Sequence, residues 1–271
     1  MFAIIGAVVL RQYWEGVSYM TDYEKAVALW QEKNIRNDAE LAMALRVHSS
    51  TFAYHSGKMA NDRVSYFDVR KIFDHDSVFS YTGDIRTLFE IYNAKKAYEF
   101  VLAAFNDRRK IDVAFIKELQ KVLTQSTYDI RLERHGELPG EYKLHEYYVG
   151  QGDIGALPED VDLEIEDLLD EIQEIPEDQA LVSAAYFHAV FESIHPFADG
   201  NGRCGRLAMN YFLVLHNHPP IIIHEEDHKA YLSALERWDL EEELRPFCFF
   251  LKEQTTKTWK NQLERNESQS S

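Results

Sequence analysis

The segment from residue 195 to residue 206 reads His195-Pro-Phe-Ala-Asp-Gly-Asn-Gly-Arg-Cys-Gly-Arg206. The residues before it, 177–194, are rich in alanine and apolar nearly all round, which is typical of a helix buried at the centre of a bundle. Pro196 should end that helix, and the glycines that flank Asn201 allow a tight turn before a second helix. We therefore predict a helix, a short loop and a second helix, with His195 fixed at the first junction.

This loop has the features of an anion-binding site. Free amides at the start of a helix, together with glycines, can surround a phosphate. Arg203 and Arg206 add positive charge on one face of the second helix, where their guanidinium groups can contact successive phosphates of a nucleotide. Asp199 is the nearest carboxylate, and such oxygen ligands hold Mg²⁺ beside phosphates. His195 adjoins the site, and an imidazole is suited to taking a proton from an attacking hydroxyl.

Taken singly, a histidine at a helix end is usually a cap, and Asp-Gly-Asn-Gly is usually a turn. The combination is much more specific, because residues 195–206 resemble the motif of Fic proteins, His-x-Phe-x-Asp/Glu-Gly-Asn-Gly-Arg-x-x-Arg, at every defined position. The resemblance extends over about residues 48–250 and is weakest at the two ends. It implies a mostly α fold, namely a Fic-type helical bundle with a short β-hairpin flap.

The resemblance also implies an activity and assigns roles to the motif. The protein would be an adenylyltransferase that moves AMP from Mg-ATP to a Tyr, Thr or Ser hydroxyl of a target protein and of itself. His195 would be the base that activates the hydroxyl, Phe197 a core anchor, and Asp199 the ligand of Mg²⁺ or of Mn²⁺ in its place. The nucleotide phosphates would be held by Gly200, Asn201, Gly202, Arg203 and Arg206, with Arg206 on the γ-phosphate. The intact Gly-Asn-Gly favours AMP transfer, and phosphoryl transfer from a nucleotide bound in reverse is the alternative.

A β-like segment precedes the motif. Residues 141–149 contain three tyrosines and one valine and lie between Pro139-Gly140 and Gly150-Gln-Gly152, which predicts a short hairpin. By resemblance, this hairpin is the flap on which a target segment docks as an added strand. The flap residues expected to contact the target are Tyr142, Lys143, Leu144 and His145. Packing in an ordinary hairpin would explain the same side chains.

Many Fic proteins carry an inhibitory helix with the pattern Ser/Thr-x-x-x-Glu-Gly/Asn, whose glutamate pairs with the second arginine of the motif. The best match in this chain is Ser56-Gly-Lys-Met-Ala-Asn61, on a helix expected around residues 48–61. A match that begins at Thr51 fits less well. Because Ala60 replaces the glutamate, we expect Arg206 to be free for a γ-phosphate and autoinhibition to be lost.

The composition of the chain disfavours some classes of partner and indicates a cellular location. The chain has 46 acidic and 29 basic residues and a net charge of −17, which disfavours nucleic acid and anionic membrane surfaces as partners. Its two cysteines offer no disulfide framework, so we expect a reducing, cytoplasmic location. The apolar run at residues 2–10 is too short to span a bilayer. The expected partners are ATP and an unknown target protein, and self-association is left open.

Amphipathic segments dominate the rest of the chain. They predict helices at residues 22–33, 38–48, 85–106, 112–124, 160–173, 177–194, 203–216 and 228–237, and from about 243 onward. We interpret residues 1–19 as an N-terminal extension. Residues 20–271 then form a single Fic domain with its core at about 85–250.

Two readings from other classes compete with a transferase. His216, His218, His224 and His228 have spacings that a zinc ion could bridge, but they lack a cysteine or a clear acidic fourth ligand. A nucleotide-binding regulator without catalysis is the second alternative. The presence of a base, a metal ligand and an arginine pair in one motif argues against it.

Overall fold

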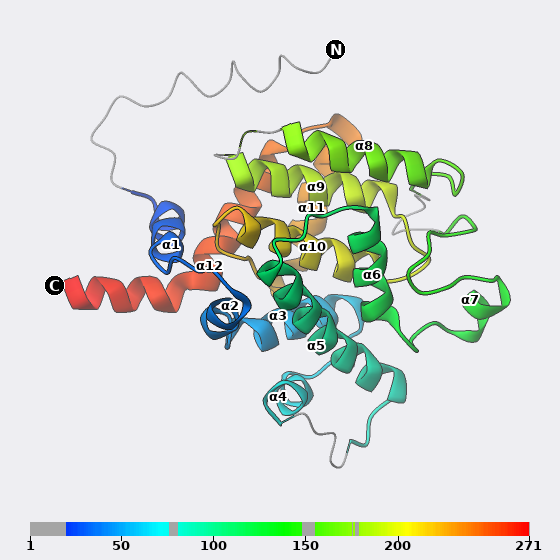
Figure 1. Ribbon diagram of the computed structural model, residues 1–271, viewed down its shortest axis with the longest axis horizontal. Helices are drawn as coiled ribbons and strands as arrows, with labels where there is room; N and C mark the ends of the chain where they lie inside the picture. Colours follow the sequence, from blue (N-terminus) through cyan, green and yellow to red (C-terminus); the bar gives the residue numbers. More distant parts are fainter. Residues whose placement is uncertain (1–19, 76–80, 148–154, 175, 177–178, 271) are drawn as a thin grey trace.

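The computed structural model describes residues 20–75, 81–147, 155–174, 176 and 179–270 (Figure 1). This part of the chain is built from helices and the turns between them, and it contains no β-strand. The expected mostly α fold is therefore confirmed. Among the described residues, no helix combines the length and the apolar character that crossing a membrane requires.

The described helices are joined by turns and loops of different lengths. In chain order they are α1 (Asp22–Gln31), α2 (Asp38–Ala44), α3 (His48–Ala60), α4 (Tyr66–His75), α5 (Ile85–Asn106), α6 (Val113–Thr124), α7 (Ile130–Arg134), α8 (Val161–Glu174), α9 (Ala180–Ile194), α10 (Asn201–Leu215), the 3₁₀ turn η2 (Glu225–Asp227), α11 (His228–Glu241) and α12 (Arg245–Ser270). Every helix predicted from the sequence is present, with ends that differ by a few residues.

Several helices begin where a side chain accepts a hydrogen bond from a free backbone amide. Thr21 and Glu24 form a capping box at α1, Asp84 accepts from the amide of Thr87 at α5, and Asp112 starts α6 in the same way. These caps explain why the predicted starts of α1, α5 and α6 agree closely with the structure.

Two short helices, α4 and α7, were not predicted. The hydroxyl of Ser65 accepts from the amide of Asp68 at the start of α4, and Asp129 accepts from the amides of Arg131 and Leu132 at the start of α7. Helix α7 has only 5 residues, too few turns for an apolar period to stand out. Helix α4 has 10 residues, and its buried Val69 and Ile72, three residues apart, were an available signal.

Helices α9 and α10 form the centre of the bundle (Figure 1). Helix α8 covers one side of α9, while α6 and α3 contact α10. Ala184, Phe187 and Phe191 of α9 are fully buried because neighbours surround the helix. This arrangement explains the apolar character of residues 180–194 and holds the loop between α9 and α10 in place.

A second, smaller apolar cluster joins α3, α4 and α5. Its buried members are Ala53, Val64, Val69, Ile72 and Ile91. The cluster fixes α3 against α5, and α3 also contacts α10. The helix that carries the inhibitory-type motif therefore lies next to the helix that carries both motif arginines.

Candidate active site

His195 ends α9 in an unusual backbone conformation. Its φ and ψ angles are 50° and 61°, in the left-handed region, and its amide donates to the carbonyl of Phe191 over 3.1 Å. Non-glycine residues seldom adopt this conformation, which costs on the order of 1–3 kcal/mol and occurs often at functional sites. Pro196 follows and stops the helix, as predicted. His195 is thus held, half-buried, at the entrance of the loop.

Asn201 pins the loop that follows. Its side-chain oxygen accepts from the amide of Phe197 over 2.9 Å, and its side-chain nitrogen donates to the carbonyl of Phe197 over 2.7 Å. The Phe197 ring is fully buried, as expected of an anchor. The side chain of Asn201 thus holds the loop, and its expected phosphate-binding role stays a prediction. Its backbone amide lies at the start of α10, where it could serve an anion.

We predict that Asn201→Ala lowers the free energy of unfolding by about 2–4 kcal/mol, because two buried backbone groups lose their partner. The measurement is urea denaturation at equilibrium. Asn106→Ala is the matched control, since Asn106 is exposed and bonds only Asp107, at 3.4 Å. We expect the control to stay within about 0.5 kcal/mol of the unchanged protein. Equal stability of both variants would contradict the role assigned to Asn201.

Glycines keep the start of α10 open. Gly200 has a φ of 87°, and a Cβ there would lie 2.6 Å from the Thr124 methyl group. A Cβ on Gly202 would lie 2.8 Å from Nη1 of Arg206. No side chain caps the first turn of α10. The first amides of this helix are therefore available to an anion, as the sequence predicts.

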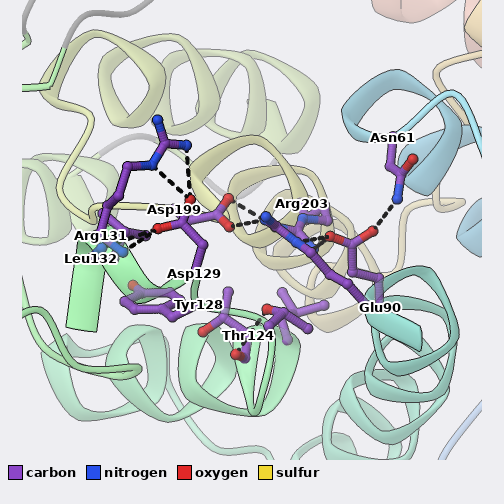
Figure 2. Close-up of polar contacts among 12 residues, drawn as sticks. Asn61, Glu90, Thr124, Tyr128, Asp129, Arg131, Leu132, Asp199 and Arg203 are labelled. Atoms are coloured by element: carbon purple, nitrogen blue, oxygen red, sulfur yellow. Dashed lines mark hydrogen bonds and ion pairs between the residues drawn. The ribbon is translucent and has the colours of Figure 1, made fainter. Parts of the chain in front are cut away.

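Arg203 is buried beside this helix start with an unused donor. Its Nη2 donates to Oδ1 of Asp199 over 3.0 Å (Figure 2). Its Nη1 has no hydrogen-bond partner among the described residues, and Oε1 of Glu90 is 3.9 Å away. A buried guanidinium N–H without a partner is costly. The site therefore favours an incoming anion that can accept this hydrogen bond.

Arg206 lies deeper on α10 and contacts the inhibitory-type helix. Its Nε donates to the hydroxyl of Ser56 over 3.0 Å, and its Nη2 donates to the Ser56 carbonyl over 3.1 Å. Arg206 is therefore held by the motif serine in this structure, and its availability to a γ-phosphate stays a prediction. Ala60 is exposed at the end of α3 and Asn61 caps that end.

A buried carboxyl group near Arg206 was missed in the sequence. Burial in α9 raises the pKa of Glu192 to about 7, while Arg206 opposes the rise. Its Oε1 has no hydrogen-bond partner among the described residues and lies 3.9 Å from Nε2 of His188. Burial lowers the pKa of His188 to about 3, and Arg206 lowers it further. A glutamate within the apolar run of α9 was the available signal.

Asp199 is the one carboxylate of the loop, and its donor set suits Mg²⁺. The described residues contain no group of three or more His, Cys, Asp or Glu side chains that could enclose a metal ion. Mg²⁺ bound with a nucleotide needs no such cage, because it takes one or two carboxylates together with phosphate oxygens and water. A single, partly exposed aspartate beside an anion site fits that pattern.

The four histidines proposed as zinc ligands are not brought together. Nδ1 of His216 contacts the Phe212 carbonyl, Nε2 of His218 contacts the Tyr23 hydroxyl, and Nδ1 of His224 contacts Oε1 of Gln254, all at 2.9 Å. These are the helix-end and core contacts typical of histidines without a metal. The described part of the chain offers no support for the zinc reading.

The expected flap lies beside the motif, but its described residues do not form a hairpin. Residues 141–147 form turns and irregular chain, and the remaining positions 148–150 fall outside the described residues. The buried carboxylate of Glu137 accepts from the amide of Leu144 over 3.1 Å and from the hydroxyl of Tyr147 over 2.8 Å. Hydrogen bonds to one carboxylate therefore hold this segment in place of the backbone hydrogen bonds between two strands that a hairpin would need.

Two of the four flap residues point inward. Lys143 is buried, and its amide donates to the carbonyl of Pro196 over 2.9 Å. Tyr142 packs on the ring of Phe197, with centroids 5.5 Å apart. Leu144 is 59% exposed, and His145 is exposed beside Glu137. Contact of Tyr142 and Lys143 side chains with a target is therefore not supported, whereas Leu144 and His145 are accessible.

Comparisons with known proteins find a family that matches the part of the chain carrying the motif at residues 195–206. The Fic/DOC family model matches residues 110–213, which include α6, α9 and most of α10. The chain is 30% identical over 175 residues to Protein adenylyltransferase Fic of Drosophila persimilis, a match that covers 62% of this chain and 32% of that protein. The protein of the same name in Drosophila erecta is 31% identical over 172 residues, covering 62% and 33%. The chain thus spans about a third of the length of the curated relatives it matches.

Solved structures share the fold. A Fic domain containing signaling protein from Bacteroides thetaiotaomicron superimposes with a TM-score of 0.76 at 21% identity, covering 92% of this chain and 97% of that chain. Fic-1 from C. elegans, residues 134–508, superimposes with a TM-score of 0.71 at 22% identity, covering 92% and 73%. These likenesses extend the match beyond the motif to nearly the whole bundle. The predicted resemblance is therefore confirmed: residues 110–213 match the Fic/DOC family, and the bundle as a whole has the fold of Fic proteins.

Proposed function

We propose that this protein transfers AMP from Mg-ATP to a hydroxyl side chain of a protein, itself included. The observation that carries the proposal is the buried Arg203, whose Nη1 has no hydrogen-bond partner among the described residues, beside an uncapped helix start and next to His195. The name protein adenylyltransferase on relatives at about 30% identity supports the same reaction. A cytoplasmic location remains part of the proposal.

The triphosphate would bind along the start of α10. Backbone amides of the first turn and the unused Nη1 of Arg203 would hold the α- and β-phosphates. Arg206 would exchange its contacts with Ser56 for the γ-phosphate, because a charged oxygen is a stronger acceptor than a hydroxyl or a carbonyl. Mg²⁺, or Mn²⁺ in its place, would be held by Asp199 and would neutralise charge on the phosphates.

His195 would act as the general base. Its imidazole accepts the proton of the target hydroxyl while the oxygen attacks the α-phosphorus. The bond between the α-phosphorus and its bridging oxygen breaks, and pyrophosphate leaves with that oxygen. The product is a phosphodiester between AMP and the side chain, and the proton is left on His195. The fixed backbone of His195 at the end of α9 supports this role, because it holds the ring in one place relative to the phosphate site.

The target would approach over the segment that precedes the motif. Residues 142–145 lie against the loop, as the hydrogen bond between the Lys143 amide and the Pro196 carbonyl supports. Leu144 and His145 are the accessible side chains there and are the proposed target contacts. An extended target could add backbone hydrogen bonds with little side-chain specificity.

The test is the intact mass of the purified protein after incubation with Mg-ATP. We expect a population that is heavier by one AMP. Asp199→Asn should not gain this mass, because the amide is a poor ligand for Mg²⁺ in place of a carboxylate. A gain that corresponds to one phosphate instead would contradict the proposal and favour phosphoryl transfer.

A further inference from the structure

Four charged side chains of alternating sign, Arg86, Asp199, Arg203 and Glu90, form a ring that includes the proposed metal ligand Asp199. Oδ2 of Asp199 accepts from Nη2 of Arg86 over 3.0 Å, and Oδ1 accepts from Nη2 of Arg203 over 3.0 Å. Glu90 closes the ring, with its Oε1 3.1 Å from Nε of Arg86 and 3.9 Å from Nη1 of Arg203. Arg86 and Glu90 lie one turn apart on α5, outside the Fic motif.

Two members of the ring are largely buried, and a third is exposed to solvent. Glu90 is 9% exposed, and its Oε2 accepts from Nδ2 of Asn61 over 2.6 Å (Figure 2). Arg203 is also 9% exposed, whereas the side chain of Arg86 is 44% exposed. Exposed side chains exchange partners at low cost. Arg86 is therefore the member that can leave the ring while Glu90 and Arg203 stay in place.

The ring occupies both oxygens of the carboxylate that a metal would use. A divalent cation that arrives alone must compete with Arg86 for Oδ2 and must lie close to two guanidinium groups of like charge. A triphosphate removes this obstacle, because its oxygens accept charge-assisted hydrogen bonds from the same guanidinium groups. Binding of the nucleotide would thus release Asp199 and bring negative charge to the metal.

We propose that Arg86 is a positioning residue that holds Asp199 until a nucleotide binds and then contacts the phosphates, so that the divalent cation binds after the triphosphate. The inference rests on the proposed function only in taking ATP as the ligand. It assigns α5 a part in the site and links Asn61, at the end of α3, to Asp199 through Glu90 and Arg86.

The experiment measures binding and not transfer. Mn²⁺ is titrated by electron paramagnetic resonance against the full chain without nucleotide, and ATP is titrated by calorimetry in the presence of a chelator. The variants are Arg86→Gln, Arg86→Lys, which keeps the charge, and Arg131→Gln. Arg131 is the matched control because it is exposed and pairs with Asp129 at 2.9 Å, not with Asp199.

We expect Arg86→Gln to bind Mn²⁺ alone about tenfold more tightly, because one competing ion pair and one like charge are removed. The same variant should bind metal-free ATP about three- to tenfold more weakly, because one phosphate contact is lost. Arg86→Lys should stay close to the unchanged protein in both titrations, and Arg131→Gln should match it.

Either of two results would overturn the inference. One is equal Mn²⁺ affinity of Arg86→Gln and the unchanged protein, and the other is unchanged affinity of Arg86→Gln for metal-free ATP. If Arg86→Gln fails to fold, Arg86→Ala replaces it with the same two expectations, and unchanged affinity of Arg86→Ala for Mn²⁺ alone or for metal-free ATP also overturns the inference. A protein that binds as expected but transfers no AMP would refute the proposed function and leave this inference standing.

Discussion

His195→Ala is expected to lower the rate of AMP transfer by about 10²- to 10⁴-fold, the contribution of a general base, while the affinity for ATP changes by no more than a few-fold. The ring of His195 stands at the end of α9, and none of the proposed phosphate contacts depends on it. Removing it should therefore affect the chemical step and not nucleotide binding. The measurements are transfer of α-labelled AMP at saturating Mg-ATP and ATP binding by calorimetry.

A second helix-end histidine supplies the control. His216 follows α10, and its side chain contacts the carbonyl and the ring of Phe212 within that helix, so His216→Ala should retain full transfer. Undiminished labelling by His195→Ala would refute the general-base role. Equal losses in the two variants would mean that the loss comes from the fold and not from the chemistry.

Ala60→Glu is expected to reduce autolabelling by about 10- to 100-fold at equal Mg-ATP. Ser56 already contacts Arg206, and residue 60 lies one turn further along the same helix, so a longer side chain there can approach the same guanidinium. One guanidinium cannot give its bonds to both a carboxylate and a γ-phosphate, and such a pair is worth about 1.5–3 kcal/mol. The nucleotide would still bind, but its α-phosphorus would face the hydroxyl incorrectly.

Ala60→Gln separates charge from size. Glutamine has the length of glutamate without its charge, so it should inhibit far less than Ala60→Glu. Adding Arg206→Ala to Ala60→Glu should not restore transfer, because the same arginine orients ATP. Equal autolabelling by Ala60→Glu and the unchanged protein would mean that residues 56–61 are not an inhibitory motif.

The centre of the site could be predicted because its geometry is set locally. Pro196 cannot continue a helix and Gly200 adopts a φ of 87°, so the helix, loop and helix follow from adjacent residues. The apolar residues of α9 likewise required neighbours on every side. The helix around residues 48–61 was expected only from the resemblance to the inhibitory pattern, and the contact between Ser56 and Arg206 was not predicted.

The rest of the site depends on contacts between distant segments. Arg86 meets Asp199 only because α5 packs beside α10, and no spacing in the sequence connects them. The predicted hairpin is not formed at residues 141–147 for a related reason. Glu137 draws Leu144 and Tyr147 around a buried carboxylate, whereas the tyrosines between flanking glycines suggested paired strands.

The measurement that tests the proposed reaction most directly compares two labels of ATP. The purified chain is incubated with Mg²⁺ and ATP labelled on the α-phosphate or, in a parallel reaction, on the γ-phosphate, and protein-bound label is counted. His195→Ala serves as the background in each reaction. AMP transfer predicts that the α-label is attached and the γ-label leaves with pyrophosphate. Attachment of the γ-label, with the α-label remaining in solution, would contradict AMP transfer.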